Sequence, residues 1–339
     1  MEITTLNDYV GQEQIKKRVV VAIKSSVLRN TAFPHTLLAG PAGLGKSSIC
    51  RVIANECHCP FFSYLATNID GEKQIEAIFS KIPKTGYDLR TGEVIDREAV
   101  LPAVIFIDEI HNLKRKTIEM LHTVLENNRI TLKRKNYTTG MVEPTVCWVP
   151  EFCLMGATNY FGSLPKPFRD RFPMQLLFEV YQNEEIFQVL KNLAEKRKIK
   201  MDDDAIAEIS DKSRGVPRIA ISLFNKAFDM AVASGNGVGE IKKEHVLTML
   251  EYEEIDEKGL NRMDRKALSY LATVPRPIGL KAFAQALDED EQTVENVIEP
   301  YLVRIGFIIR TGSGRYLTEE GKNHIRRERE MSLYPVQAV

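Results

Sequence analysis

The sequence predicts an α/β fold: a parallel sheet with flanking helices, followed by two smaller parts that are mainly helical. Three observations predict it. A short apolar run leads into a glycine-rich segment at 40–47, and a second apolar run ends in two carboxylates at 108–109. The last third holds three helical stretches followed by two strand-like runs. Short apolar runs bounded by turn signals are typical of buried parallel strands, whose two faces are covered by helices.

The composition is that of a globular protein. Of the 339 residues, 44% are hydrophobic and 27% are charged, and Lys plus Arg equals Asp plus Glu at 46 each. The length predicts two or three domains, and the balanced charge argues neither for nor against a nucleic-acid partner. We find no apolar run long enough to span a membrane and no signal-peptide core, so we expect no membrane association and a cytoplasmic location.

Residues 40–47 read Gly-Pro-Ala-Gly-Leu-Gly-Lys-Ser, the G-x-x-x-x-G-K-S pattern of a phosphate-binding loop. A strand expected at 35–39 and a helix at 48–56 supply the context that this motif requires. Glycines let successive N–H groups turn toward one phosphate chain, and the helix N-terminus adds a positive partial charge. We expect Lys46 at the outer phosphates of ATP and the Ser47 hydroxyl on Mg²⁺. The alternative is a glycine-rich turn before an ordinary helix.

The nucleotide contacts expected from this loop share one short stretch of chain. They are Gly40, Ala42, Gly43, Leu44, Gly45, Lys46, Ser47 and Ser48.

Two carboxylates end the apolar run at 103–107, which predicts a second buried strand. Paired acids at the C-terminal end of a strand downstream of a phosphate loop suit the metal and water side of nucleotide hydrolysis. We expect Asp108 to hold Mg²⁺ through its water shell and Glu109 to orient or deprotonate the attacking water. The alternative is a pair of solvated acids that cap a helix starting near Leu113.

The other elements of the first part follow from the spacing of apolar residues. Helices are expected at 13–30, 72–82 and 117–126, and further strands at 61–66 and 152–158. The polar stretch at 84–101 predicts a surface loop or insertion.

A protruding hairpin is expected between the last of these helices and the strand at 152–158. Strand-like runs at 130–132 and 145–149 enclose a basic, glycine-ended tip at 133–140. The tip is either a hydrated loop or a contact for a partner protein or a phosphate backbone.

Polar and basic residues follow the strand at 152–158. Thr158 ends this strand, where a hydroxyl beside the carboxylate strand can sense the γ-phosphate. The turn at 164–172 carries Arg169 and Arg171 between prolines and aromatic residues. In a lone monomer these arginines are surface charges, whereas in a ring one of them can reach the next subunit's ATP as an arginine finger.

From about residue 181 the chain becomes helical, with helices expected at 184–196, 203–210, 219–234 and 242–250. Within this part, Pro217 begins a helix and Arg218 lies in its first turn. A cation is disfavoured there by the helix dipole, so it needs an anion nearby. That anion is either a bound ATP phosphate or a local acidic side chain.

The last third predicts a winged helix, a relative of the helix-turn-helix. Helices are expected at 264–273, 280–287 and 291–305, and strands at 307–311 and 315–318. Arg310 and Arg315 flank the turn of this hairpin and can meet DNA phosphates. The third helix is acidic, which argues against base reading and favours backbone contact without sequence choice. The tail from 326 onward is expected to be solvated.

The order of these features resembles that of AAA+ ATPases, and seven segments resemble the RuvB family of Holliday junction branch migration motors. The segments are 10–12, 40–47, 106–111, 156–158, 168–172, 213–220 and 298–307. The last lies outside the nucleotide site, which makes it more specific than the ATPase motifs. The resemblance implies a large ATPase domain at 1–180 with its hairpin near 129–150, a helical lid at 181–255, a DNA-binding winged helix at 256–330 and a tail at 331–339.

The resemblance also implies an activity. It implies a homo-hexameric ring that hydrolyses ATP with Mg²⁺ to move duplex or four-way junction DNA, a helicase-type reaction in recombination and repair. In the family the hairpin docks the junction-binding partner RuvA.

Roles for single residues come from the same resemblance. It implies that Thr158, with Asn159 as its neighbour, senses the γ-phosphate. Arg171 matches the finger that acts on the next subunit, and Arg218, preceded by Pro217, matches the arginine of the lid. The residues implied around adenine are Val10, Gly11 and Tyr181.

Departures from the family pattern are also present. Ala42 replaces a usual second proline, Ser47 replaces threonine, and 84–101 is inserted. The hairpin is longer and more basic than expected, which leaves the RuvA partnership open; one interpretation is a divergent version from a phage or mobile element. A second hypothesis is an ATP-dependent loader or remodeller of a protein complex in DNA replication, with the winged helix as a tether. A P-loop kinase would leave Arg171 and Arg218 without roles.

Overall fold

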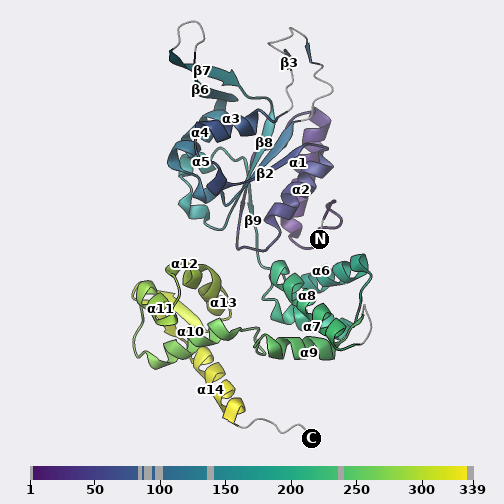
Figure 1. The fold of residues 1–339 in the computed structure, drawn as a ribbon, viewed down its shortest axis with the longest axis vertical. Coiled ribbons are helices and arrows are strands. Elements are labelled where there is room, and N and C mark those ends of the chain that lie inside the picture. Colours follow the sequence, from purple (N-terminus) through teal and green to yellow (C-terminus); the bar gives the residue numbers. More distant parts are fainter. Residues whose placement is uncertain are drawn as a thin grey trace. The chain divides into compact units, whose positions relative to one another are not determined.

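A computed structural model describes residues 3–82, 86–87, 94–95, 102–135, 141–235 and 240–333 (Figure 1). The chain forms two compact units. The first consists of residues 1–189 together with 216–218, and the second of 190–215 together with 219–339. The stretch expected as a loop at 84–101 lies outside the described residues except for two short paired strands, β3 (Gly86–Tyr87) and β4 (Val94–Ile95). Within the described part of the chain, no helix has the length and apolar character needed to cross a membrane.

The first unit is built on a five-stranded sheet whose order is β2-β5-β8-β1-β9. All its strand pairs are parallel. The strands are β1 (Thr36–Ala39), β2 (Phe61–Leu65), β5 (Ala103–Asp108), β8 (Phe152–Thr158) and β9 (Met174–Leu177). We did not expect β9, because its four residues carry a glutamine and show no apolar run; it is an edge strand in which Leu177 is 63% exposed.

Helices cover both faces of this sheet, with α1 (Glu13–Arg29) and α2 (Lys46–Glu56) on one side and α3 (Glu72–Phe79) and α4 (Arg115–Asn127) on the other (Figure 1). Alternation along β5 explains the arrangement. Ile105 and Ile107 pack in one core with Phe79 and Leu121, whereas the strand's other face is turned toward α2. All of β5 except its last residue is buried, as expected for a strand between two helical layers.

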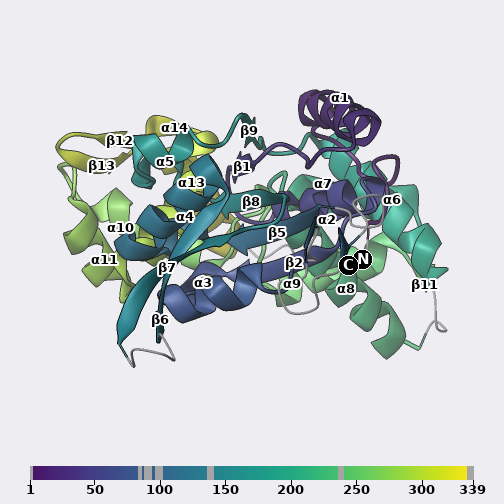
Figure 2. The same ribbon diagram turned by 90° about the horizontal axis from the view of Figure 1, so that it is seen from above.

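The expected hairpin consists of β6 (Arg129–Lys135) and β7 (Val142–Trp148), and it projects away from the five-stranded sheet (Figures 1 and 2). Ile130 and Leu132 anchor its base in the core of the unit. The tip at 136–140 lies outside the described residues.

The first part of the second unit is a helical bundle. It contains the end of α6 (Asn183–Arg197), then α7 (Asp203–Lys212), α8 (Pro217–Ala233) and α9 (Lys243–Tyr252). Two short parallel strands, β10 (Lys200–Met201) and β11 (Glu240–Ile241), pair beside them.

The second part of this unit has the expected winged-helix order, with an irregular turn in its third helix. Its elements are α10 (Arg262–Thr273), α11 (Leu280–Leu287), α12 (Glu291–Thr293), α13 (Glu299–Arg304), β12 (Ile308–Thr311), β13 (Gly314–Leu317) and α14 (Glu319–Leu333). The helix expected at 291–305 is helical throughout 291–304, but a π-helical turn at Val294–Ile298 interrupts its α-helical hydrogen bonding just before Pro300, whose ring cannot continue a regular helix. The stretch from 326 onward, which was expected to be solvated, starts inside α14, which continues to Leu333, and Arg326 and Arg327 are exposed.

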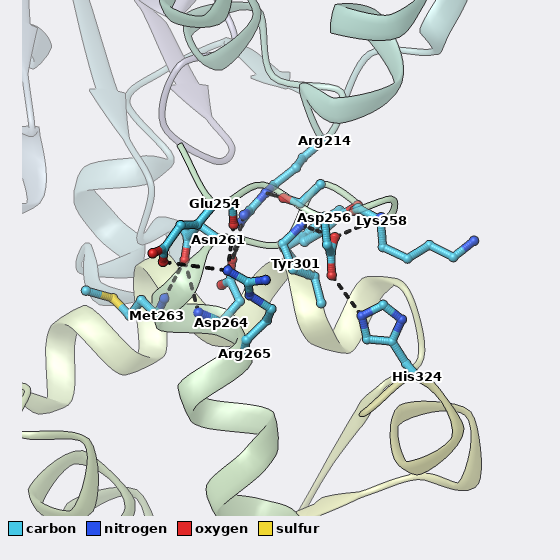
Figure 3. Close-up of polar contacts among 12 residues, drawn as sticks. Arg214, Glu254, Asp256, Lys258, Asn261, Met263, Asp264, Arg265, Tyr301 and His324 are labelled. Carbon is cyan, nitrogen blue, oxygen red and sulfur yellow. Dashed lines mark hydrogen bonds and ion pairs between the residues drawn. The ribbon is translucent and has the colours of Figure 1, made fainter. Parts of the chain in front are cut away.

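A buried ion pair joins the two parts of the second unit (Figure 3). Arg214 Nη2 lies 2.5 Å from Asp264 Oδ2, and the Asp264 side chain is 2% exposed. The guanidinium of Arg214 also stacks on Tyr301, 4.6 Å from its ring centre. Asp264 accepts the N–H of Asn261 as well, so it caps α10 and holds the arginine at once.

Candidate nucleotide site

Strand order brings the expected site residues to one edge of the sheet. β8 lies between β5 and β1, and all three strands run in the same direction. Their carboxyl ends therefore place Asp108, Thr158 and the glycine-rich loop after β1 side by side. From β1 the chain crosses to β2 at one edge of the sheet and then returns through β5 and β8 toward β1. The last strand, β9, lies on the opposite side of β1. This reversal of direction is where open α/β sheets bind ligands.

The loop at 40–47 has the backbone that phosphate binding needs. Gly43 has φ 84° and Gly45 has φ 90°, values in the left-handed region that favours glycine. A Cβ at Gly43 would lie 2.8 Å from Val216 Cγ1 and 2.9 Å from Arg218 Cβ. Gly43 thus allows the segment that carries Arg218 to lie directly on the loop, and its carbonyl accepts the Arg218 N–H at 3.3 Å.

Lys46 begins α2 and points back along its own loop. Its Nζ donates to the carbonyls of Gly40 at 2.7 Å and Pro41 at 2.8 Å. Burial lowers the pKa of Lys46, and the nearby carboxylates of Asp108 and Glu109 oppose that effect. Lys46 is therefore within electrostatic reach of both acids and of Arg218.

An aromatic cluster closes the other side of the loop. Tyr9 is 2% exposed, and its hydroxyl donates to the carbonyls of Leu44 at 3.3 Å and Gly45 at 3.2 Å. The Tyr181 hydroxyl shares the Leu44 carbonyl at 3.3 Å and lies 3.4 Å from the Tyr9 hydroxyl. The ring of Tyr181 also contacts Gly11, where an added Cβ would lie 2.6 Å from its Cε1. Gly11 and Tyr181, both expected near adenine, are thus neighbours, and the half-buried Val10 lies between Tyr9 and Gly11.

The sequence pattern did not predict that Tyr9 belongs to this site. The signal was available, because the aromatic residue directly precedes Val10 and Gly11 in a segment that was already singled out.

The Glu109 carboxylate and the end of β8 are linked through a histidine. Thr158 is 1% exposed, and its Oγ1 lies 3.0 Å from His111 Nδ1. His111 Nε2 lies 3.3 Å from Glu109 Oε2. The Tyr160 N–H donates to the same Thr158 oxygen at 2.9 Å, and the His111 and Tyr160 rings meet edge to face. Asn159, in contrast, is exposed at the strand end.

The residues present fit ATP and Mg²⁺. The loop between Gly40 and Lys46 is a cradle of left-handed glycines that ends at the N-terminus of α2. Ser47 is exposed in the first turn of α2, and Asp108 is half-buried at the end of β5. A hydroxyl and a carboxylate are the hard oxygen donors that Mg²⁺ prefers. Among the described residues there is no cluster of three or more His, Cys, Asp or Glu side chains that would hold a metal by themselves.

The two arginines of the turn at 164–172 differ in their surroundings. Arg171 Nη2 lies 2.8 Å from Glu126 Oε1, and its Nε donates to His122 Nε2 at 3.2 Å. Arg169 stacks on Phe161, 4.8 Å from its ring centre, and its buried Nε has no hydrogen-bond partner within the described chain. Arg171 is thus on the surface of its own subunit, with its side chain 37% exposed.

The two arginines of the wing face each other across β12 and β13, as expected, but both meet the acidic helix. Arg315 is 12% exposed and lies 2.5 Å from Oε1 of the fully buried Glu299. Arg310 is 44% exposed, 3.3 Å from Glu299 and 2.9 Å from Glu295. Arg315 is largely buried against Glu299 and stabilises the fold, whereas the half-exposed Arg310 can still contact a ligand from solvent.

Family models cover almost the whole chain. Residues 1–178 match the model described as the Holliday junction DNA helicase RuvB P-loop domain, 181–256 the RuvB AAA lid domain and 257–326 the RuvB C-terminal winged helix domain. The chain belongs to the RuvB family. It is therefore a P-loop ATPase of the AAA+ class, and this confirms the expected family and fold class.

Individual relatives agree with the family models. The chain is 35% identical over 331 residues to the Holliday junction branch migration complex subunit RuvB of Prochlorococcus marinus strain MIT 9515, covering 96% of this chain and 88% of that one. It is 34% identical over 323 residues to the protein of that name from Kosmotoga olearia, covering 94% and 88%. Among solved structures, the Thermotoga maritima RuvB Holliday junction branch migration motor has a TM-score of 0.80 at 30% identity, covering 96% of this chain and 98% of that one.

Proposed function

We propose that this RuvB-family chain is an ATP-driven motor that moves duplex or four-way junction DNA as a homo-hexameric ring. The observation that carries the proposal is the succession of RuvB P-loop, lid and winged-helix domains in one chain. The geometry of the nucleotide site supports it, because Lys46 interacts with Asp108, Glu109 and Arg218 within one unit.

In this proposal the chain's own residues divide the work of hydrolysis. The loop N–H groups and Lys46 bind the phosphates, while Ser47 and Asp108 hold Mg²⁺, which supplies charge neutralisation at the β- and γ-phosphates when bound. Glu109 orients and deprotonates water. Arg218, preceded by Pro217 at the start of α8, binds the ATP phosphates as the arginine of the lid domain.

Completion of the site requires a second copy of the chain. We propose that Arg171 leaves Glu126 to reach the ATP of a neighbouring subunit. Hydrolysis then depends on the ring, and each turnover can change the contact between subunits.

The hairpin β6–β7 supports a protein partner. Val142, Val146 and Trp148 are 64%, 58% and 69% exposed, an unusual apolar set for a free hairpin. Arg129 stacks on Trp148, 3.9 Å from the ring centre, and holds it in place. We propose that this face docks a RuvA-like junction-binding protein.

Loading or remodelling of a protein complex is the alternative, and the exposed apolar hairpin is the observation that favours it. The two functions differ in what stimulates the ATPase. A DNA motor responds to duplex or junction DNA, whereas a remodeller responds to the protein bound at the hairpin and little to DNA.

A three-strand branch migration assay tests the proposal. We expect ATP-dependent strand exchange by the unmodified chain with a junction-binding partner, and none by Lys46→Ala, which loses nucleotide binding. Val146→Ser combined with Trp148→Ser is expected to abolish partner-dependent exchange while leaving the basal ATPase intact. Strand exchange absent under all conditions, together with an ATPase that ignores DNA and responds to a hairpin-bound protein, would establish the alternative.

A further inference from the structure

His111 joins two residues to which the proposed function gives separate tasks. It follows Asp108 and Glu109 by a short 3-10 turn, Ile110–Asn112, so its ring lies next to the carboxyl end of β8. There it contacts Thr158 through Nδ1 at 3.0 Å and Glu109 through Nε2 at 3.3 Å. Both ring nitrogens are therefore occupied by residues of the site.

The set of partners determines how the protons are arranged. The Tyr160 N–H already donates to Thr158 Oγ1 at 2.9 Å, which leaves the threonine O–H free to donate to His111 Nδ1. His111 Nε2, which lies 3.3 Å from Glu109 Oε2, then carries the hydrogen and faces the carboxylate. Burial lowers the pKa of His111, against the opposing effect of Glu109 and Asp108, so the neutral ring that this arrangement needs is favoured.

Glu109 needs such support because little else orients it. Its side chain is 39% exposed, and its backbone has φ 52°, a left-handed value that is rare for a residue with a side chain. The turn is held by Ile110, which is buried and packs directly on the backbone of Gly156 in β8. A Cβ added at Gly156 would lie only 2.5 Å from Ile110 Cδ1. The backbone of Glu109 is thus held in place. Its carboxylate, within the described part of the chain, has His111 as its side-chain contact.

We propose that His111 is a positioning residue for hydrolysis: it ties the Glu109 carboxylate to the Thr158 hydroxyl, so that the water-activating group is oriented by the neighbouring strand β8. The inference rests on the proposed role of Glu109. Removing either nitrogen contact leaves a mobile carboxylate, which slows the chemical step without weakening the binding of ATP.

Substitutions at 111 separate this role from simple packing. His111→Asn can replace the contact at Nδ1 and His111→Gln the contact at Nε2, but neither can make both. His111→Phe keeps the edge-to-face contact with Tyr160, whose ring centre lies 4.9 Å away, and removes both nitrogens. We expect all three to lower kcat by about tenfold or more, with the Kd of a fluorescent non-hydrolysable ATP analogue within about twofold of the unmodified chain. His58→Asn, at an exposed histidine far along the chain, is the matched control and is expected to change neither quantity.

A double-mutant cycle tests whether His111 acts through Glu109. Glu109→Ala is expected to lose steady-state hydrolysis by itself, and its residual rate is measured in single turnover with excess protein. Adding His111→Asn to Glu109→Ala is expected to slow that rate by less than about twofold, because the carboxylate to be positioned is gone. Thr158→Val should resemble His111→Asn, and Thr158→Ser should restore most of the rate.

The outcomes divide clearly. Full kcat in His111→Phe, equal losses from His111→Asn with and without Glu109, or a loss confined to analogue binding would each overturn the positioning role. Unchanged hydrolysis in Glu109→Ala would instead contradict the proposed function of the site. Thermal midpoints of all variants within a few degrees of the unmodified chain establish that the fold is intact.

Discussion

Arg171 Nη2 lies 2.8 Å from Glu126 Oε1, so the arginine expected to act on a neighbouring subunit is held by helix α4 of its own. The pair is open to solvent, with side chains 37% and 43% exposed. Exposed pairs of this kind contribute about 0.2–1 kcal/mol. The contact is therefore weak enough to be exchanged for a phosphate, and it competes with the proposed function of Arg171 in the ring.

Glu126→Gln is expected to release Arg171 and raise kcat for ATP by up to about fivefold, the factor that corresponds to ~1 kcal/mol. The measurement is steady-state ATPase at saturating ATP and at a protein concentration that supports the ring. Glu119→Gln, which alters an exposed acid of the same helix paired with Arg115, is the control. A fall in kcat would mean that Glu126 presents Arg171 to the neighbour. Arg171→Ala should lose hydrolysis and keep ATP binding, and normal hydrolysis by this variant would refute a shared site.

The two wing arginines should separate by function. Arg315→Ala removes a partner from the fully buried Glu299, and breaking such a pair typically costs about 3–5 kcal/mol. Arg310→Ala removes a half-exposed partner and is expected to cost less than about 1 kcal/mol. Chemical denaturation measures both. In DNA binding, Arg310→Ala should lower affinity and flatten the dependence on salt, because one phosphate contact is lost; an unchanged salt slope would remove Arg310 from the DNA surface.

Gly11→Ala is expected to damage the proposed adenine side of the nucleotide site. The new Cβ would lie 2.6 Å from Tyr181 Cε1, and φ 75° at this residue is strained for alanine. Tyr181 must then move away from Leu44, and we expect nucleotide affinity to fall by about tenfold or more, equivalent to ~1.4 kcal/mol. Isothermal titration with ADP measures it. Gly71→Ala tests the left-handed backbone alone, because its φ is 86° and nothing lies within 4 Å of the added atom. If both substitutions lowered nucleotide affinity equally, Tyr181 would have no role in nucleotide binding.

Stability should fall in mild acid because of His35. Burial lowers its pKa from 6.5 to about 4, and its Nδ1 accepts the Leu154 N–H at 2.9 Å. The unfolded chain takes up a proton below pH 6.5, whereas the folded chain resists until about 4, so stability is present above this window and is lost as the pH falls through it. The loss is at most about 3 kcal/mol. His35→Asn keeps an acceptor that does not titrate, and urea unfolding between neutral and acid pH should show a smaller loss for this variant.

The residues proposed for the nucleotide site could be named from sequence because they lie in local motifs. The loop at 40–47 and the acids at 108–109 each depend on a few adjacent positions. Parallel pairing then places their strand ends together, which needs only the rule that strands of this kind share one edge. The register of β8 between β5 and β1 completes the arrangement.

What could not be predicted depends on contacts between distant residues. Strand β9 is four residues long and polar in part, and it is a strand because β1 offers it an open edge. Nothing in the order of amino acids shows that Arg315 forms an ion pair with Glu299, or that Arg171 forms one with Glu126. His111 stood inside a recognised motif, yet its partners became visible only when β8 was placed beside β5.

Residues 216–218 are packed with the loop at 40–47, although the chain on both sides of them belongs to the other compact unit. The nucleotide-binding half is consequently discontinuous. A fragment that stops near residue 189 lacks Arg218, however well it folds, and should be compared with the full chain only for steps that do not involve that arginine. A separate polypeptide that carried Arg218 would have to bind the fragment without the backbone connections on either side of residues 216–218. Kinetic experiments on the nucleotide site therefore require the whole chain.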